Sequence, residues 1–239
     1  MNRVEAQPAF VLHARAWRET SLLLDVLSRD HGRVGLVARG VRSVRSRTPR
    51  SLLQPFAPLQ LGWSGHGELG TLHAAEAAGA PLPVAGEALL CALYLNELIV
   101  RLVPRNDPHA DLFAAYLDTL ARLAHGHPPA WTLRRFERDL LGQLGYGLLL
   151  DVEADTGASI DAAAEYAYFL EQGPVRWRGP GDGLKLRGAA LLALARDEEP
   201  ESTDLPSLRR LLRELIAQRL DGAQLNAWDL LRGKSRDSA

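Results

Sequence analysis

The sequence predicts an α+β protein in which an N-terminal five-stranded β-barrel is followed by an all-helical C-terminal region. Three observations indicate this. Residues 1–80 contain short apolar runs separated by turn signals, as strands do. From Pro83 onward the apolar residues recur at helical spacing. Between these parts lies the Pro- and Gly-containing segment Gly79–Pro83, so we expect domains at residues 1–80 and 81–239.

Five candidate strands fill the first domain, at Phe10–His13, Ser21–Leu27, Gly32–Ala38, Leu52–Trp63 and Glu68–Glu76. In the third of them Val34, Leu36 and Ala38 share one side, which is the alternation of a half-buried strand. Ser64–Gly67 has the composition of a hairpin turn. Five short strands favour a closed barrel, because a flat sheet would leave edges that need protection.

The second domain opens with three clear helical patterns. Residues Glu87–Val103 are apolar nearly all round, which predicts a buried helix. We expect Asp107 and Pro108 to open the next helix. A third is expected to be capped by Thr132 and to end at Gly145.

Beyond the third helix the pattern weakens. Residues 151–183 are rich in Asp, Gly and Ala and predict a loop-rich insertion. Helical patterns resume over Leu184–Arg196 and Ser207–Leu220, and Gly222–Leu231 predicts a last short helix.

The charge is unevenly distributed along the chain. The 239 residues carry a formal net charge of −1. Residues 1–80 nevertheless contain ten Arg against six acidic residues, and residues 29–50 contain seven Arg against the single acid Asp30. A polyanion responds to this local field rather than to the mean charge.

The basic segment therefore predicts nucleic-acid binding. Forked guanidinium groups suit phosphate oxygens, and small barrels use their loops and one strand face to bind oligonucleotides. Trp17, beside two arginines, is a candidate for stacking on a base, although packing at the barrel end is the stronger interpretation. The basic segment has its own alternative, a solvated loop that only prevents aggregation. The candidate DNA-binding residues are Arg33, Arg39, Arg42, Arg45, Arg47, Arg50 and Trp17.

Catalytic patterns are weak, and we expect a protein that is not an enzyme. No His pair or carboxylate cluster has metal-ligand spacing, so neither a metal nor another cofactor is predicted. Cys91 is the only cysteine, which leaves no intrachain disulfide. The N-terminus has no apolar signal core and no stretch could cross a bilayer, which favours a cytoplasmic protein without a membrane partner.

A second candidate site lies at the start of the third helix. Arg134 and Arg135 are followed by an apolar face, a combination that can hold a peptide carboxylate and its hydrophobic neighbours. The alternative interpretation is that both arginines pair with acidic residues nearby, such as Glu137 or Asp139.

Several motifs together resemble the RecO family of bacterial recombination mediators. In the first domain they are Arg18-Glu19-Thr20-Ser21, Ala38-Arg39-Gly40-Val41-Arg42 and Leu53-Gln54-Pro55-Phe56; in the second they are Leu133-Arg134-Arg135-Phe136-Glu137 and Leu144-Gly145-Tyr146-Gly147. The resemblance extends in order over essentially the whole chain.

The resemblance implies an OB-fold joined to a helical domain. It also implies binding of single- and double-stranded DNA, annealing of complementary strands, and loading of RecA, together with RecR, onto DNA coated by the single-stranded-DNA-binding protein SSB. The acidic, phenylalanine-ending SSB tail would bind the helical domain, with Arg134 or Arg135 holding its carboxylate.

The sequence departs from the family pattern at two places. Many RecO proteins carry a four-cysteine zinc site after the Leu-Gly-Tyr element, whereas Val152–Val175 contains no cysteine, so zinc is not expected. Leu225–Trp228 stands where the family tends to have a Ser-Arg pair, which puts the role of that pair in doubt.

Three other classes remain compatible with the residues alone. They are a protein-docking module whose arginines serve solubility, an RNA-binding barrel protein, and a hydrolase.

Overall fold

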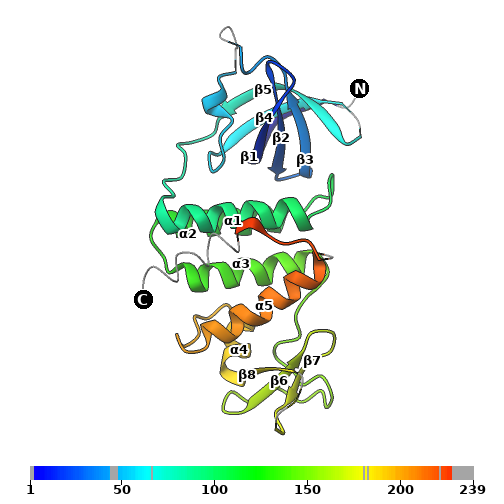
Figure 1. Ribbon diagram of the computed structural model, residues 1–239, viewed down its shortest axis with the longest axis vertical. Helices are drawn as coiled ribbons and strands as arrows, with labels where there is room; N and C mark the ends of the chain where they lie inside the picture. Colours follow the sequence, from blue (N-terminus) through cyan, green and yellow to red (C-terminus); the bar gives the residue numbers. More distant parts are fainter. Residues whose placement is uncertain are drawn as a thin grey trace. The chain divides into compact units, whose positions relative to one another are not determined.

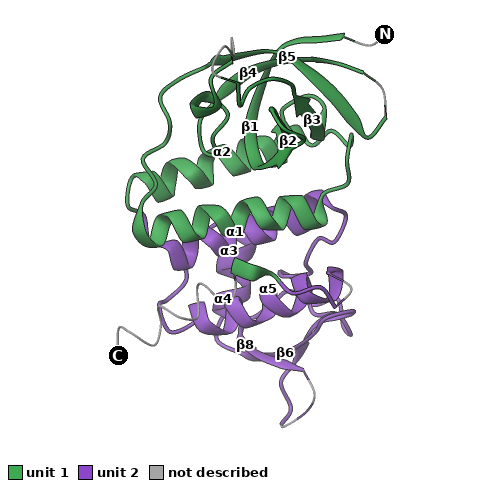
Figure 2. Cartoon of the chain, turned by 45° about the horizontal axis from the view of Figure 1, so that its top comes forward, with its two compact units in different colours: residues 1–126, 225–239 green, residues 127–224 purple. Residues whose placement is uncertain are grey.

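A computed structural model describes residues 3–43, 48–65, 67–179, 181, 183–220 and 222–227. The chain forms two compact units, which Figure 2 colours separately. The first contains residues 1–126 and 225–239, and the second contains residues 127–224. No helix within the described ranges is long and apolar enough to cross a bilayer.

The first unit contains the predicted five-stranded barrel (Figure 1). Its strands are β1 (Arg3–Trp17), β2 (Ser21–Ser28), β3 (Gly32–Ala38), β4 (Leu59–Ser64) and β5 (Leu69–Ala77). They close in the order β1-β2-β3-β5-β4, and β3 and β5 are parallel. The fold class is thereby confirmed.

Two strand predictions were wrong in length. β1 is much longer than Phe10–His13, because its first half pairs with β4 and its second half with β2. Two irregularities, between Val4 and Gln7 and between Val11 and His13, bend it from one neighbour to the other and interrupt the alternation. β4 starts only at Leu59, since Pro55 and Pro58 precede it and Arg50–Leu52 form a short 3₁₀ helix.

The outer face of β1 packs on two helices of the same unit, α1 (Gly86–Leu102) and α2 (Ala110–Ala124). The Phe10 ring lies 5.6 Å from Phe113 and 5.3 Å from Tyr116, centroid to centroid. Such aromatic contacts add to the burial of the faces that they join. The predicted start of α2 at Asp107–Pro108 was wrong, because the Asp107 carbonyl instead lies against Gly32 in a loop.

The chain returns to the first unit near its C-terminus. The Glu97 carboxylate on α1 accepts hydrogen bonds from Asn226 N and Nδ2, at 2.9 and 3.1 Å, and from Ala227 N at 2.9 Å. Leu225 and Ala227 are buried. Of the short helix predicted over Gly222–Leu231, residues 222–225 are not helical, and residues 228–231 lie outside the described residues.

The second unit combines three helices with a small sheet. The helices are α3 (Pro129–Gln143), α4 (Gly188–Arg196) and α5 (Leu205–Arg219). The strands β6 (Glu165–Phe169), β7 (Gly173–Arg176) and β8 (Leu184–Arg187) pair in the order β7-β6-β8. The sheet was not predicted, and it occupies much of the expected loop-rich insertion.

Two local predictions in this unit were also wrong. Residues 184–187 form a strand rather than the start of a helix, because Leu184 and Leu186 alternate inward with exposed Lys185 and Arg187. Thr132 does not cap α3, which begins at Pro129, and its side chain is buried in the first turn.

Candidate nucleic-acid interface

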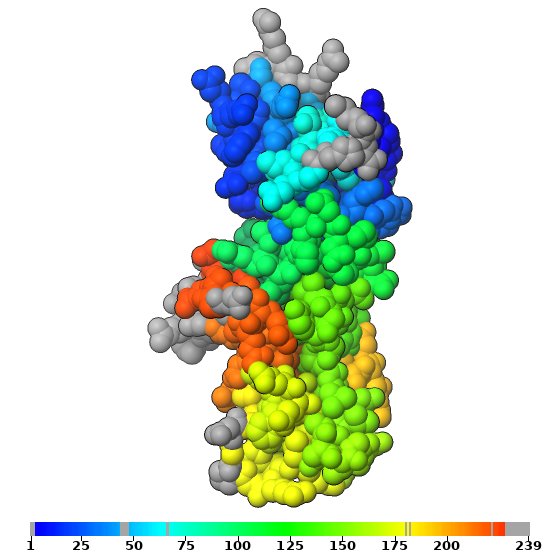
Figure 3. All heavy atoms as spheres, turned by 90° about the vertical axis from the view of Figure 1, so that its right-hand side faces the viewer, coloured from blue at the N-terminus to red at the C-terminus, as the bar shows by residue number. Residues whose placement is uncertain are grey.

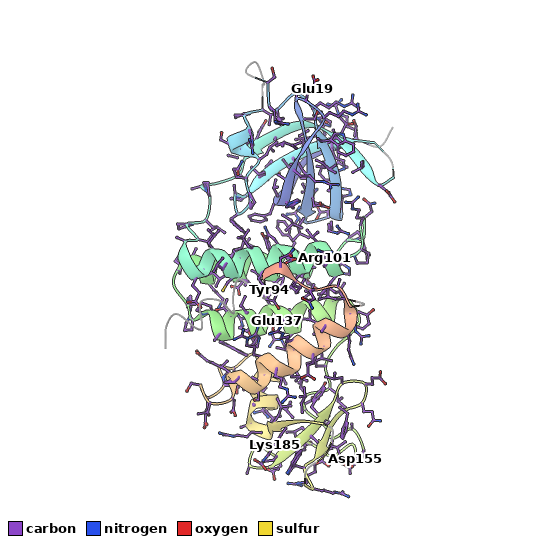
Figure 4. All side chains as sticks on the ribbon, in the orientation of Figure 1. Glu19, Tyr94, Arg101, Glu137, Asp155 and Lys185 are labelled. Atoms are coloured by element: carbon purple, nitrogen blue, oxygen red, sulfur yellow. The ribbon has the colours of Figure 1, made fainter. Side chains whose placement is uncertain are left out.

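The candidate interface lies where the β1–β2 turn meets the segment that follows β3. Leu22 pairs with Ala38, so the chain leaves β3 beside this turn. Arg42 N donates to Thr20 O at 2.9 Å, and Val41 is buried in the barrel core. Figure 4 labels Glu19 in the turn, at the end of the barrel away from α1. In Figure 3 the blue atoms of the hairpin and the lighter blue atoms of the following segment share this end.

Four exposed arginines surround this turn, and we call them the barrel-end arginines: Arg15, Arg18, Arg39 and Arg42. None of them forms an ion pair with a described carboxylate, although Arg42 Nη1 donates to Arg18 O at 3.4 Å. Arg50, in the 3₁₀ helix, is exposed as well. Arg45 and Arg47, also predicted to bind DNA, lie outside the described residues.

The barrel-end arginines were only partly predicted from the sequence. Arg39 and Arg42 belong to the basic segment, whereas Arg15 and Arg18 were not among the candidate DNA-binding residues. Arg15 and Arg18 flank the β1–β2 hairpin, and this hairpin lies at the same end of the barrel as the basic segment. This place beside the hairpin is the signal that could have identified them.

Arg33, which was also predicted to bind DNA, lies at the other end of β3 from the barrel-end arginines, and its contact with DNA stays a prediction. Its side chain is 14% exposed, its Nε donates to Val103 O at 2.8 Å, and its Nη1 lies 3.3 Å from Asp25 Oδ1. The same carboxylate oxygen accepts from Arg105 Nη2 at 3.0 Å. Burial lowers the pKa of Arg33, and the Asp25 charge partly offsets this. Arg33 therefore joins the barrel to the chain after α1.

The two tryptophans of the barrel differ in exposure. Trp63 is buried in the barrel core and has a structural role. Trp17 is 36% exposed at the end of β1, in the same strand as Arg15 and next to Arg18. Its position leaves part of the indole ring accessible to a base.

The paired arginines of α3 are both engaged. Arg134 is 7% exposed, and its guanidinium donates to both carboxylate oxygens of buried Glu137, labelled in Figure 4. Arg135 Nε and Nη2 donate to the two Asp197 oxygens at 2.6 and 2.5 Å. Of the two side chains Arg135 is the more exposed, at 17%, and whether either arginine holds the SSB tail stays a prediction.

The residues at the family's zinc position do not fit a zinc ion. The chain's single cysteine, Cys91, lies buried in α1. Glu153, in the expected region, instead accepts from Thr156 Oγ1 at 2.6 Å and from the Tyr166 hydroxyl at 3.3 Å. Within the described ranges there is no group of three or more His, Cys, Asp or Glu side chains arranged to hold a metal.

A closed five-stranded barrel with an arginine-rich end, followed by helices, defines the class of OB-fold proteins joined to a helical body. Residues 1–81 match the family model "Recombination protein O N terminal", and residues 84–229 match "Recombination protein O C terminal". The chain belongs to the RecO family.

Curated relatives agree over nearly the full length. "DNA repair protein RecO" of Nitrosococcus oceani is 52% identical over 232 residues, which are 96% of this chain and 93% of that protein. The protein of the same name from Stenotrophomonas maltophilia strain K279a is 47% identical over 231 residues, covering 95% of this chain and 96% of that protein. The one from Aromatoleum aromaticum is 46% identical and covers 96% of both chains.

Proposed function

We propose that this protein acts in DNA repair and recombination by binding single- and double-stranded DNA and annealing complementary strands. It would also work with RecR to help load RecA onto SSB-coated DNA in the cytoplasm. The names of the curated relatives support a repair role. The observation that carries DNA binding is the group of exposed barrel-end arginines, which have no ion-pair partner among the described carboxylates in a chain whose net charge is −1.

The mechanism requires no bond chemistry and hence no catalytic residue. Two phosphate backbones must approach, and the arginines reduce their mutual repulsion while counterions are released. Val41 and the Arg42 amide anchor the described part of the basic segment at the barrel, which fixes the backbone from which its guanidiniums reach the phosphates. Trp17 adds a ring for one base to stack on.

The test is a salt titration of single-stranded DNA affinity. Replacement of Arg39 and Arg42 by Ala removes two positive charges from the barrel end. The slope of log affinity against log salt should fall by about 0.7 for each phosphate that the protein no longer neutralises. The matched control is Arg3→Ala with Arg29→Ala, because these exposed barrel arginines pair with Glu5 and Asp30.

An equal reduction of the slope in both double variants would contradict the assignment to the barrel end. An RNA strand of the same sequence, included as competitor, distinguishes DNA binding from the RNA-binding alternative.

Arg135 is the proposed contact for the SSB tail. Its side chain is 17% exposed, it lies on α3 and it already binds a carboxylate. Arg135→Ala should weaken binding of a synthetic tail peptide while leaving the affinity for naked DNA unchanged.

A further inference from the structure

A buried carboxylate connects three parts of the second unit. Glu153 lies in the loop between α3 and β6, and its side chain is 7% exposed. Its Oε2 accepts from Thr156 Oγ1 at 2.6 Å, and its Oε1 accepts from the Tyr166 hydroxyl at 3.3 Å. Arg176 Nη1 lies 4.0 Å from the same Oε1 and supplies a positive charge. The carboxylate therefore joins its own loop to β6 and β7.

The two hydroxyls that bind Glu153 are themselves fixed by the backbone. Thr156 Oγ1 accepts from Ala158 N at 3.2 Å, and the Tyr166 hydroxyl accepts from Asp161 N at 2.9 Å. Because each hydroxyl already accepts a backbone N–H, its own hydrogen is directed to the carboxylate. Donors of this kind offset the cost of burying a charged group, which would otherwise be strongly unfavourable.

Backbone contacts extend this network to the rest of the small sheet and to α4. Ala154 N donates to Pro174 O of β7 at 2.7 Å, and Gly188 N at the start of α4 donates to Ala164 O at 2.8 Å. A Cβ at Gly188 would stand 2.0 Å from Asp161 O, so the close approach requires glycine. The loop thus links β6, β7 and α4.

This loop lies where many RecO proteins hold a zinc ion with four cysteines, and Val152–Val175 contains none. A structural zinc ion joins loop segments through ligands from separate places in the chain and contributes folding free energy. We propose that the Glu153 carboxylate fills this structural role without a metal, as the acceptor around which the loop, β6 and β7 assemble. The proposal concerns the folding of the second unit and is independent of the proposed function.

The first experiment follows thermal unfolding of the full-length protein with a chelator, with stoichiometric Zn²⁺ and with neither. The melting temperature should be the same in all three, because the described side chains include no cluster that would hold the ion. A melting temperature that falls after chelation, or rises with Zn²⁺, would overturn the proposal, since a metal would then stabilise the fold.

The second experiment removes the carboxylate. Glu153→Gln keeps the shape but takes one acceptor from the two hydroxyls, and the melting temperature should fall by about 5–10 °C. The matched control is Asp155→Asn, at an exposed position of the same loop that Figure 4 labels. It removes the same charge and should shift the melting temperature by less than about 2 °C. Equal effects of the two variants would contradict the role of Glu153.

Hydrogen exchange locates the effect within the chain. In Glu153→Gln the amides of Ala154 and Ala158 should exchange at least about ten-fold faster, while barrel amides keep the wild-type rate. Thr156→Ala removes only one donor, so this milder variant should show the same local increase if Glu153→Gln does not fold. The affinity for single-stranded DNA should match that of wild type. Exchange that rises evenly over both units, or not at all in the loop, would show that the carboxylate does not hold this loop.

Discussion

Asn96 shows how much a single buried amide can connect. Its Nδ2 donates to Leu12 O of β1 at 2.8 Å, and its Oδ1 accepts from the Tyr116 hydroxyl of α2 at 2.6 Å. Asn96 itself lies on α1, so three elements meet at one side chain. Burial also raises the pKa of Tyr116, which keeps its hydroxyl a donor.

Asn96→Ala should therefore lower the free energy of unfolding by about 2–3 kcal/mol, because it leaves two buried polar groups without this partner. Tyr116→Phe should cost less, about 1 kcal/mol, since it keeps the bond to Leu12. Urea denaturation measures both values. Equal losses of stability would mean that the bond to β1 contributes nothing.

The pKa of Asp197, lowered by hydrogen bonding from Arg135, predicts how the stability of the protein depends on pH. Its folded-state pKa is below the ordinary 3.8, so its contribution to stability is present above that value and is lost as the pH falls through the folded-state pKa. The stability difference between wild type and Asp197→Asn should be constant from about pH 7 to pH 5 and shrink below pH 4. Denaturation at a series of pH values measures it, and a difference that grows on acidification would refute the assignment.

At the scale of elements, Asp25 joins β2, β3 and the segment after α1. The Asp25 carboxylate accepts hydrogen bonds from Arg33 and Arg105. Arg33 also donates to Val103 O, and Arg105 also donates to Glu68 O.

Arg33→Ala should lower the free energy of unfolding by about 1–3 kcal/mol, since it removes one of the two ion-pair partners of Asp25 in a poorly solvated place. Its DNA salt slope should match that of wild type. A slope as shallow as that of the Arg39/Arg42 double variant would place Arg33 on the DNA surface.

The sequence predicted those elements whose signals are local. Alternation identified β3, a long run that is apolar nearly all round identified α1, and helical spacing identified α5. β1 was underestimated because its two bulges are set by two different neighbours. β8 was mistaken for helix because four residues carry too little periodicity to separate it from α4.

The candidate site shows a similar limit. Composition located the basic segment, but whether an arginine is available depends on distant partners. Arg33 is held by Val103, 70 residues away, and Arg135 by Asp197, 62 residues away. No local pattern encodes such pairings, so exposed and engaged arginines looked alike in the sequence.

At the scale of the whole molecule, the charges are used differently in the two units. In the second unit the α3 arginines are matched by Glu137, Asp139 and Asp197. In the first, the barrel-end arginines have no described acidic partner. A long-range field thus comes from one end of the barrel, while the helical unit offers short-range carboxylate contacts. We propose that steering toward DNA and selection of a protein partner are separate properties of the two units.

If the two properties are separate, barrel-end variants and the Arg135 variant should show opposite defects in strand annealing. Arg39→Ala with Arg42→Ala should slow annealing of naked complementary strands, because backbone repulsion is screened less. Arg135→Ala should anneal naked strands at the wild-type rate but lose most of its activity on SSB-coated strands, since the tail no longer concentrates the protein there. Fluorescence quenching between labelled strands, with intact SSB and with tail-deleted SSB, measures all four combinations. On tail-deleted SSB, Arg135→Ala and wild type should be indistinguishable; a persistent difference would show that Arg135 acts through DNA and that the two properties are not separate.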